Sequence, residues 1–256
     1  MTVPTLAPPA VTGLGTLYVY GIAAAGVRAP RATGVAGSPV GLLTESGLCA
    51  AVSPAPERPR ARRRDLLAHQ AVLEELVAQG PVLPMRFAVL TPRPDALRAQ
   101  LRSDAAHLKR QLDDIAGCVE LNVKGTVVAD CLAELVRRDE QLRTLALRAR
   151  RRPGYDADVR LGEALAKAVR REARRAAREV LARLTPLAVR TADGPLDDGR
   201  VLSTSFLVRA DDEPGFRREV AARARAHRDR LALGVTGPLP CYSFVEARPA
   251  SRPAGR

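Results

Sequence analysis

The residue types that most often build metal or redox sites are sparse and scattered in this chain of 256 residues. None of the four cysteines lies in a CxxC pair, and the three histidines are far apart. A zinc site or a secreted disulfide framework would show closer and more regular spacing. We therefore expect no metal, no cofactor and reduced thiols, as in a cytoplasmic protein. The residues concerned are Cys49, Cys118, Cys131, Cys241, His69, His107 and His227.

Motifs for nucleotide binding or acyl transfer are also missing from the sequence. No Walker A loop or GxGxxG follows an expected strand, and no GxSxG elbow is present. Paired carboxylates occur at Asp113-Asp114 and Asp197-Asp198, where a helix end and a turn are expected. Solvation or capping explains them better than acid–base catalysis. The histidines lie on amphipathic helical patterns, which favours a packing role over a catalytic one. We predict that the protein is not an enzyme.

Positive charge is the most pronounced feature of the composition. The formal net charge is +13, and all but three of the 41 basic residues are arginine. Between residues 137 and 183, fourteen Arg and one Lys face seven acidic residues, an excess of eight. This helical stretch is either an electrostatic docking face or, as charge runs usually are, a solvated exterior. The candidate docking residues are Arg171, Arg174, Arg175 and Arg178.

The first half of the chain predicts an α+β domain over residues 16–116, preceded by a disordered tail at 1–15. Residues 1–27 carry no charged side chain, but their prolines and glycines argue against a membrane span. The predicted strands are 16–24, 40–43, 47–53 and 82–90, and the predicted helices are 64–79 and 95–115, with a loop at 28–39 and a charged linker at 54–63.

The predicted strand 82–90 places Leu83, Met85 and Phe87 on one face, as core residues. Arg86 then lies inside an apolar strand, where a buried guanidinium needs a partner. We predict an ion pair between Arg86 and a carboxylate such as Glu74 or Glu120, in preference to a ligand contact.

The second half predicts another α+β domain over residues 117–247, followed by a tail at 248–256. Alternation of apolar and polar residues indicates a strand at 118–128. Arg-rich helices are predicted at 130–150 and 157–184, strands at 186–191 and 201–209, a helix at 213–230, and strands at 231–236 and 241–246. The order β, α, β, β, α, β is that of a ferredoxin-like split βαβ unit.

Several blocks of sequence resemble the GvpF/GvpL family of gas vesicle proteins, over residues 16–247. These are TLYVYGIAAA near the start, His69 followed by VLPMRF (82–87), GCVELNVKG (117–125), TSFLV (204–208) and TGPLPCYSFVE (236–246). In this chain Ala88 stands where the family usually has glycine after Arg-Phe. Ser203 or Thr204 replaces a common asparagine, Leu239 a frequent tryptophan and Cys241 a frequent proline. The residues that carry the family pattern are His69, Leu83, Pro84, Arg86, Phe87, Glu120, Gly237, Pro238, Tyr242, Ser243 and Phe244.

The resemblance implies a non-catalytic cytoplasmic protein that takes part in building gas vesicles. It implies two α+β domains and contacts with the major shell protein and other accessory Gvp proteins, without a membrane or specific nucleic acid. A basic nucleic-acid-binding module is the main alternative, although no aromatic platform interleaves the arginines. An enzyme with a site assembled from dispersed residues is the third.

The block GPLPCYSFVE (237–246) predicts a structural strand that ties the C-terminal end to the body of the protein. Tyr242 and Phe244 would share one face of this strand, with Ser243 on the other. The alternatives are an ordinary edge strand of the second domain and a strand that also contacts the first domain.

Overall fold

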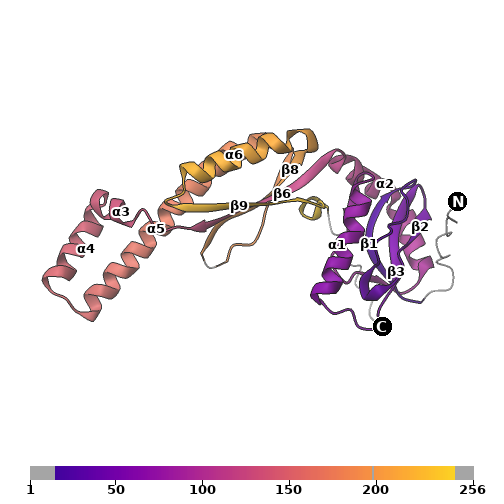
Figure 1. Ribbon diagram of the computed structural model, residues 1–256, viewed down its shortest axis with the longest axis horizontal. Coiled ribbons are helices and arrows are strands. Elements are labelled where there is room, and N and C mark those ends of the chain that lie inside the picture. Colours follow the sequence, from indigo (N-terminus) through magenta and orange to yellow (C-terminus); the bar gives the residue numbers. More distant parts are fainter. Residues whose placement is uncertain (1–14, 198, 246–256) are drawn as a thin grey trace, which may run out of the picture. The chain divides into compact units, whose positions relative to one another are not determined.

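The computed structural model describes residues 15–197 and 199–245. Within these residues the chain forms six α-helices and nine β-strands, arranged in two sheets (Figure 1). The backbone divides into two compact units. Unit 1 contains the residues up to Val119 and those from Leu239 onward, and unit 2 is Glu120–Pro238. The predicted tails at 1–15 and 248–256, apart from Gly15, lie outside the described residues.

Unit 1 contains a sheet with the strand order β2-β3-β1-β4, and β5 pairs with β1 beside β4. Every pairing in this sheet is antiparallel. Ser46 and Gly47 form the tight β2–β3 turn and both have positive φ, at +53° and +78°. The strands are β1 (Leu17–Ala24), β2 (Gly41–Glu45), β3 (Leu48–Pro54), β4 (Val82–Pro84) and β5 (Leu90–Thr91).

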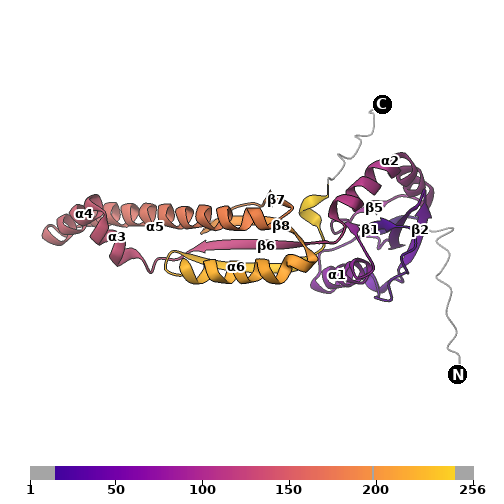
Figure 2. The same cartoon turned by 90° about the horizontal axis from the view of Figure 1, so that it is seen from above.

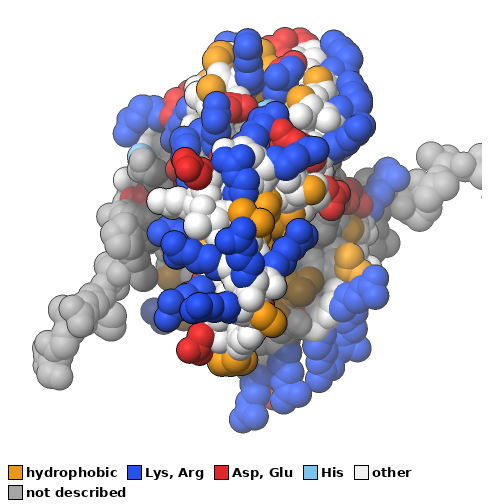
Figure 3. Space-filling model, turned by 90° about the vertical axis from the view of Figure 1, so that its left-hand side faces the viewer, with side chains coloured by type: hydrophobic (Ala, Val, Ile, Leu, Met, Phe, Trp, Pro, Cys, Tyr) orange, Lys and Arg blue, Asp and Glu red, His pale blue; other side chains and the backbone are white. Residues whose placement is uncertain are grey.

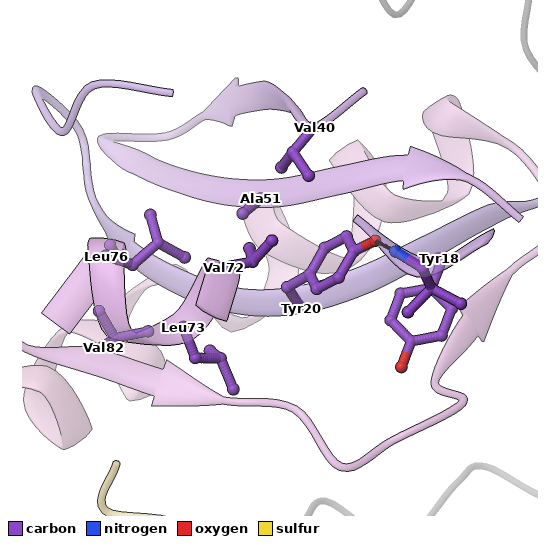
Figure 4. Packing of buried hydrophobic residues seen from close by; sticks show 10 residues of the cluster. Tyr18, Tyr20, Val40, Ala51, Val72, Leu73, Leu76 and Val82 are labelled. Carbon is purple, nitrogen blue, oxygen red and sulfur yellow. Dashed lines mark hydrogen bonds between the residues drawn. The ribbon is translucent and has the colours of Figure 1, made fainter. Parts of the chain in front are cut away.

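Two helices, α1 (Arg63–Val77) and α2 (Pro94–Ile115), lie on opposite faces of this sheet (Figure 2). This explains why β1 is buried from Leu17 to Ala23 on both of its faces. On the α1 side, Val72, Leu73 and Leu76 belong to one buried cluster with Tyr18 and Tyr20, and Val72 lies next to the Tyr20 ring (Figure 4). This cluster is the part of the core from which the candidate site is built.

The predicted strand 82–90 is wrong in its middle. The chain leaves the sheet after Pro84, forms a turn, and returns only at Leu90. Ala88 in this turn has φ +69°, a left-handed conformation that a strand cannot contain. Leu83 is fully buried as predicted, but Met85 and Phe87 are half-buried. Arg86 is exposed rather than buried, so it needs no ion-pair partner.

Unit 2 contains a sheet with the strand order β7-β8-β6-β9. Helices α5 and α6 contact each other and both contact β8. The strands are β6 (Cys118–Val127), β7 (Arg190–Asp193), β8 (Arg200–Arg209) and β9 (Leu231–Leu239), and the helices are α3 (Leu132–Arg138), α4 (Glu140–Arg151), α5 (Tyr155–Leu184) and α6 (Glu213–Ala226).

The first half of α5 extends beyond the sheet of unit 2 and packs there against α3 and α4 (Figure 2). The single helix predicted at 130–150 is two helices, broken at Asp139. The Asp139 carboxylate accepts hydrogen bonds from the N–H groups of Gln141 and Leu142, so it caps α4. Because the backbone of Asp139 is extended, α3 ends before it and α4 begins after it.

Other boundaries differ from the predictions for local reasons. Val35–Gly37 forms a 3₁₀ turn inside the predicted loop. Thr185–Leu187 forms another around Pro186, so β7 begins at Arg190 rather than at 186. Helix α6 ends at Ala226, where His227 is no longer helical, so the predicted helix 213–230 was too long.

The predicted strand 241–246 is wrong as well. β9 continues to Leu239, and Tyr242–Phe244 then forms a 3₁₀ turn. Pro240 has no N–H to donate to a neighbouring strand, and its carbonyl instead accepts from the N–H of Tyr242 at 2.7 Å. Phe244 is buried and Tyr242 is 37% exposed, so the two rings do not share an environment. Residue 246 lies outside the described residues.

Candidate functional site around His69

Unit 1 places a histidine in the middle of a buried aromatic cluster. His69 lies on the sheet-facing side of α1 and is 4% exposed. Its ring stacks on Tyr20 at a centroid distance of 5.5 Å and meets Tyr18 and Phe87 edge-on at 5.7 and 5.9 Å. Tyr18 and Tyr20 both point toward α1 because they are two residues apart in β1.

The hydrogen bonds of His69 define its tautomer. Nε2 lies 3.1 Å from the carbonyl oxygen of Met85, which can only accept, so Nε2 carries the hydrogen. Nδ1 is then an acceptor, and the hydroxyl of Tyr18 donates to it at 3.0 Å. The Tyr18 oxygen in turn accepts from the N–H of Ala88 at 3.0 Å. The chain of bonds therefore starts and ends in the 85–88 turn and holds that turn against β1 and α1.

The second tyrosine stabilises a different loop. The Tyr20 hydroxyl accepts from the N–H of Val35 at 2.7 Å and pairs with Ser53 Oγ at 2.9 Å. Asp65, one turn before His69, accepts from the N–H of Ala36 at 3.3 Å. Both contacts fix the 3₁₀ turn at Val35–Gly37 over the end of the cluster (Figure 4 includes the Tyr20 contact).

The ionisation of the cluster favours neutral side chains. Burial lowers the pKa of His69, an effect that its bond to the Met85 carbonyl only partly offsets. Burial raises the pKa of Tyr18 to about 12, against the opposing effect of the Ala88 N–H. Burial likewise raises the pKa of Tyr20. A general acid or base operates best with a pKa near the working pH. These shifts move the pKa values of His69, Tyr18 and Tyr20 away from neutral pH. The geometry therefore suits structural positioning rather than proton transfer.

The C-terminal segment of unit 1 reaches the same histidine. The Tyr242 hydroxyl lies 3.4 Å from His69 Nε2, at the long end of the hydrogen-bond range. Two other family-pattern residues of unit 1, Phe87 and Tyr242, therefore contact the imidazole ring of His69. Pro84 ends β4, and Phe244 is buried nearby in the chain. Ser243 is exposed.

The remaining family-pattern residues lie in unit 2. Glu120 is 3% exposed in β6. The carbonyl of Gly237 accepts from Arg217 Nη2 of α6 at 2.5 Å, and the same guanidinium pairs with Glu213 at 2.8 Å. The Gly237–Pro238 peptide bond is cis.

The candidate docking arginines of α5 are all exposed, but they do not form one uniform surface. Arg171 pairs with Asp139 at 3.2 Å and Arg175 with Glu179 at 3.3 Å. Arg171 and Arg175 line a groove of about 570 Å³ that also holds four acidic side chains. Arg174 instead lines a cavity of about 110 Å³ beside Arg170 and Arg200. Arg178 is exposed on the same helix.

The other polar candidates have structural environments. His227 is 6% exposed, and its Nε2 lies 3.8 Å from Glu179 Oε2. His107 is half-exposed on α2. The four cysteines form no disulfide bond.

No group of three or more His, Cys, Asp or Glu side chains in the described ranges is arranged to hold a metal ion. None of the helices seen in these ranges has the length and apolar character of a membrane span.

Sequence reasoning missed Tyr18, Tyr20 and Ser53 as members of the site. A signal was present, because two tyrosines on one face of a buried strand need hydrogen-bond partners for both hydroxyls.

Comparison with known proteins identifies the relatives of this chain. The family model described as gas vesicle synthesis protein GvpL/GvpF matches residues 16–246. Gas vesicle protein F of a Streptomyces species is 38% identical over 236 residues, covering 90% of this chain and 99% of that protein.

Two solved structures have the same fold at 20% sequence identity. The crystal structure of GvpF from Anabaena matches with a TM-score of 0.77, and that of GvpF from Microcystis aeruginosa with a TM-score of 0.72. Each match covers 91% of this chain and 99% of the solved chain.

Proposed function

The chain belongs to the GvpL/GvpF family of gas vesicle synthesis proteins, and from this premise we propose that it is a non-catalytic accessory protein of gas vesicle formation. The observation that carries the non-catalytic part is the closed hydrogen-bond chain around His69. It occupies both ring nitrogens with neutral partners inside the protein. These contacts support a folding role for His69, without a substrate. The expected setting is the cytoplasm, in association with the gas vesicle.

The proposed architecture is two α+β domains, the second of them ferredoxin-like. The strand order β7-β8-β6-β9 supports this, because it places the first and third strands of a βαββαβ unit side by side in the centre. Helices α3 and α4 are then additions between β6 and α5, the first strand and the first helix of this unit. The Arg-rich segment lies on α3, α4 and α5.

We further propose that unit 1 binds the apolar shell subunit of the gas vesicle before it is assembled. The supporting observation is a pair of exposed leucines at the start of α1, Leu66 at 43% and Leu67 at 54% exposure. They precede His69 by less than one helical turn, so the buried hydrogen-bond chain orients the helix that presents them. Exposed neighbouring apolar side chains are suited to an apolar partner.

The test is co-purification of the tagged protein with the major shell protein after co-expression. Replacing both Leu66 and Leu67 with serine should reduce the recovered shell protein at least several-fold. Leu187 and Val189, exposed at 44% and 49% in unit 2, provide a matched control when both are replaced with serine. Equal recovery for the two double variants would contradict the leucine surface. No recovery with the unmodified protein would contradict shell binding itself. A gel shift that disappears with added salt would instead favour the nucleic-acid alternative.

A further inference from the structure

The arginines on the middle turns of α5 are of two kinds. Arg171 and Arg175 each form an ion pair with a carboxylate. Arg170 and Arg174 form no ion pair with any of the described residues. No carboxylate lies three or four positions from either of them along the helix. They lie one turn apart on the same side, and like charges at this spacing weaken a helix.

The two unpaired arginines line one small cavity together with a third arginine. The cavity has a volume of about 110 Å³ and is lined by residues of α5 and of the start of β8. Arg200, the first residue of β8, contributes the third guanidinium group. Its Nη1 pairs with Asp197 at 3.0 Å, but its Nε is buried and has no hydrogen-bond partner among the described residues. A buried donor without an acceptor is costly, so this N–H favours a ligand that accepts.

The charge and the size of the cavity favour one class of ligand. Among the described residues that line it, there are three guanidinium groups and one carboxylate, an excess of two positive charges. Its volume is several times the roughly 30 Å³ that a water molecule occupies in the liquid. This is room for a small oxyanion, but not for a helix or strand of another protein. The planar fork of arginine binds phosphate oxygens through paired N–H bonds.

Positive charge alone does not distinguish this cavity, because Lys and Arg side chains are spread over the surface at the α3–α4 end of unit 2 (Figure 3). The groove of about 570 Å³ that Arg171 and Arg175 line provides the contrast. Four arginines and four carboxylates line that groove, so it has no excess charge to attract an anion. The smaller cavity combines convergent arginines with a shortage of carboxylates.

We propose that Arg170, Arg174 and Arg200 form a binding site for a phosphate dianion, supplied as inorganic phosphate or as a phosphomonoester headgroup. This goes beyond the proposed function and does not depend on it. The dianion balances the excess charge of the cavity and relieves the repulsion between the two arginines of α5. It thereby links this helix to the start of β8. A carboxylate has a single charge and balances only half of the excess.

The first experiment is isothermal titration calorimetry of inorganic phosphate into the full chain at constant ionic strength. A small ligand held by a few charge-assisted bonds at a partly solvated site should have a dissociation constant of about 0.1–1 mM. Arg170→Gln and Arg174→Gln should each raise this constant at least about tenfold. The matched control is Arg171→Gln, which removes the same charge from the same helix but from a guanidinium that Asp139 already neutralises. Its effect should be less than about twofold.

Asp197→Asn should have the opposite effect on phosphate binding. It removes the carboxylate from the lining and releases Arg200 Nη1 from its ion pair, so phosphate should bind several-fold more tightly. The melting temperature separates these effects from misfolding. Arg174→Gln should not lower it, because the change ends the like-charge spacing with Arg170. A loss of binding caused by misfolding would lower it.

The second experiment identifies the source of the phosphate by flotation with phosphatidylcholine vesicles that contain phosphatidic acid. Vesicle binding that Arg174→Gln abolishes and Arg171→Gln retains would assign the site to a lipid headgroup. Binding of inorganic phosphate without vesicle binding would assign it to the free ion. Three results would overturn the proposal: acetate binding as tightly as phosphate, equal losses in Arg171→Gln and Arg174→Gln, or no saturable binding of either phosphate source.

Discussion

The four tyrosines divide between two regions that use the same side chain in opposite ways. Tyr18, Tyr20 and Tyr242 gather around His69 in unit 1, whereas Tyr155 begins α5 in unit 2 and is 83% exposed. In unit 1 the hydroxyls meet partners from the chain itself, and burial raises the pKa of Tyr18 and Tyr20. In unit 2 the ring lies in a face that the fold leaves uncovered. The contrast teaches that a tyrosine stabilises the fold only where the chain supplies partners for both its ring and its hydroxyl.

The largest expected effect is a loss of stability when a buried tyrosine of unit 1 is removed. Tyr20 is fully buried, so Tyr20→Ala should lower the free energy of unfolding of unit 1 by about 3–5 kcal/mol. Tyr155→Ala, measured at low protein concentration, should change stability by less than about 0.5 kcal/mol. Urea denaturation followed by circular dichroism gives both values. Similar losses for the two variants would remove the distinction between the regions.

His69→Leu should cost about 1–3 kcal/mol, because it leaves the Tyr18 hydroxyl and the Met85 carbonyl without their partner. It should also change the pH dependence of stability. The pKa of His69 is lowered in the folded state, so the unfolded chain binds the proton more readily and stability is lost as pH falls below about 6.5.

Melting temperatures between pH 5 and 8, a range set by the ordinary histidine pKa, should therefore fall on the acid side in the unmodified protein. The fall should be smaller in His69→Leu. It should not vanish, because burial also lowers the pKa of His227. An identical acid profile in both proteins would show that His69 is not the group responsible.

Ala88→Gly should stabilise unit 1 by up to about 1 kcal/mol. Ala88 has φ +69°, where an L-residue with a Cβ is strained by about 1–2 kcal/mol and glycine is not. Part of this gain is offset by the greater freedom of glycine in the unfolded chain. Thermal denaturation measures the sum, and a lower melting temperature would contradict the left-handed turn.

The smallest expected effect concerns the third tyrosine of the cluster. Tyr242→Phe should cost less than about 0.5 kcal/mol, since its hydroxyl lies 3.4 Å from His69 and the residue is 37% exposed. Guanidinium denaturation of the two proteins side by side resolves the difference. A loss as large as that of His69→Leu would place Tyr242 among the essential members of the cluster.

Periodic segments were predicted well from the sequence, and interruptions were not. The alternation in 118–128 and the apolar spacing in 95–115 correspond to β6 and α2. The 82–90 segment also alternates, but its Ala88 has a left-handed backbone that composition does not reveal. Asp139 interrupts a continuous helical pattern because its carboxylate caps the following helix better than it continues the preceding one.

Only some members of the candidate site were predictable, and its connections were not. The resemblance singled out His69, Phe87 and Tyr242, but Tyr18, Tyr20 and Ser53 were not identified as members of the site. Their meeting depends on contacts between residues far apart in the chain, such as Tyr18 with His69 and His69 with Tyr242. No local pattern encodes such a pairing. The prediction of a buried Arg86 followed from the strand prediction and failed with it, because Arg86 lies in the turn between β4 and β5, where its side chain is exposed.

The chain leaves unit 1 after Val119 and re-enters it at Leu239. Unit 2 is therefore inserted into unit 1 rather than appended to it. During synthesis the N-terminal residues emerge first and ordinarily fold first. Here the ribosome must deliver more than a hundred further residues before Tyr242 arrives. Synthesis of unit 1 thus begins first and is completed last. The final step of its folding can occur only after the whole inserted segment has been synthesised.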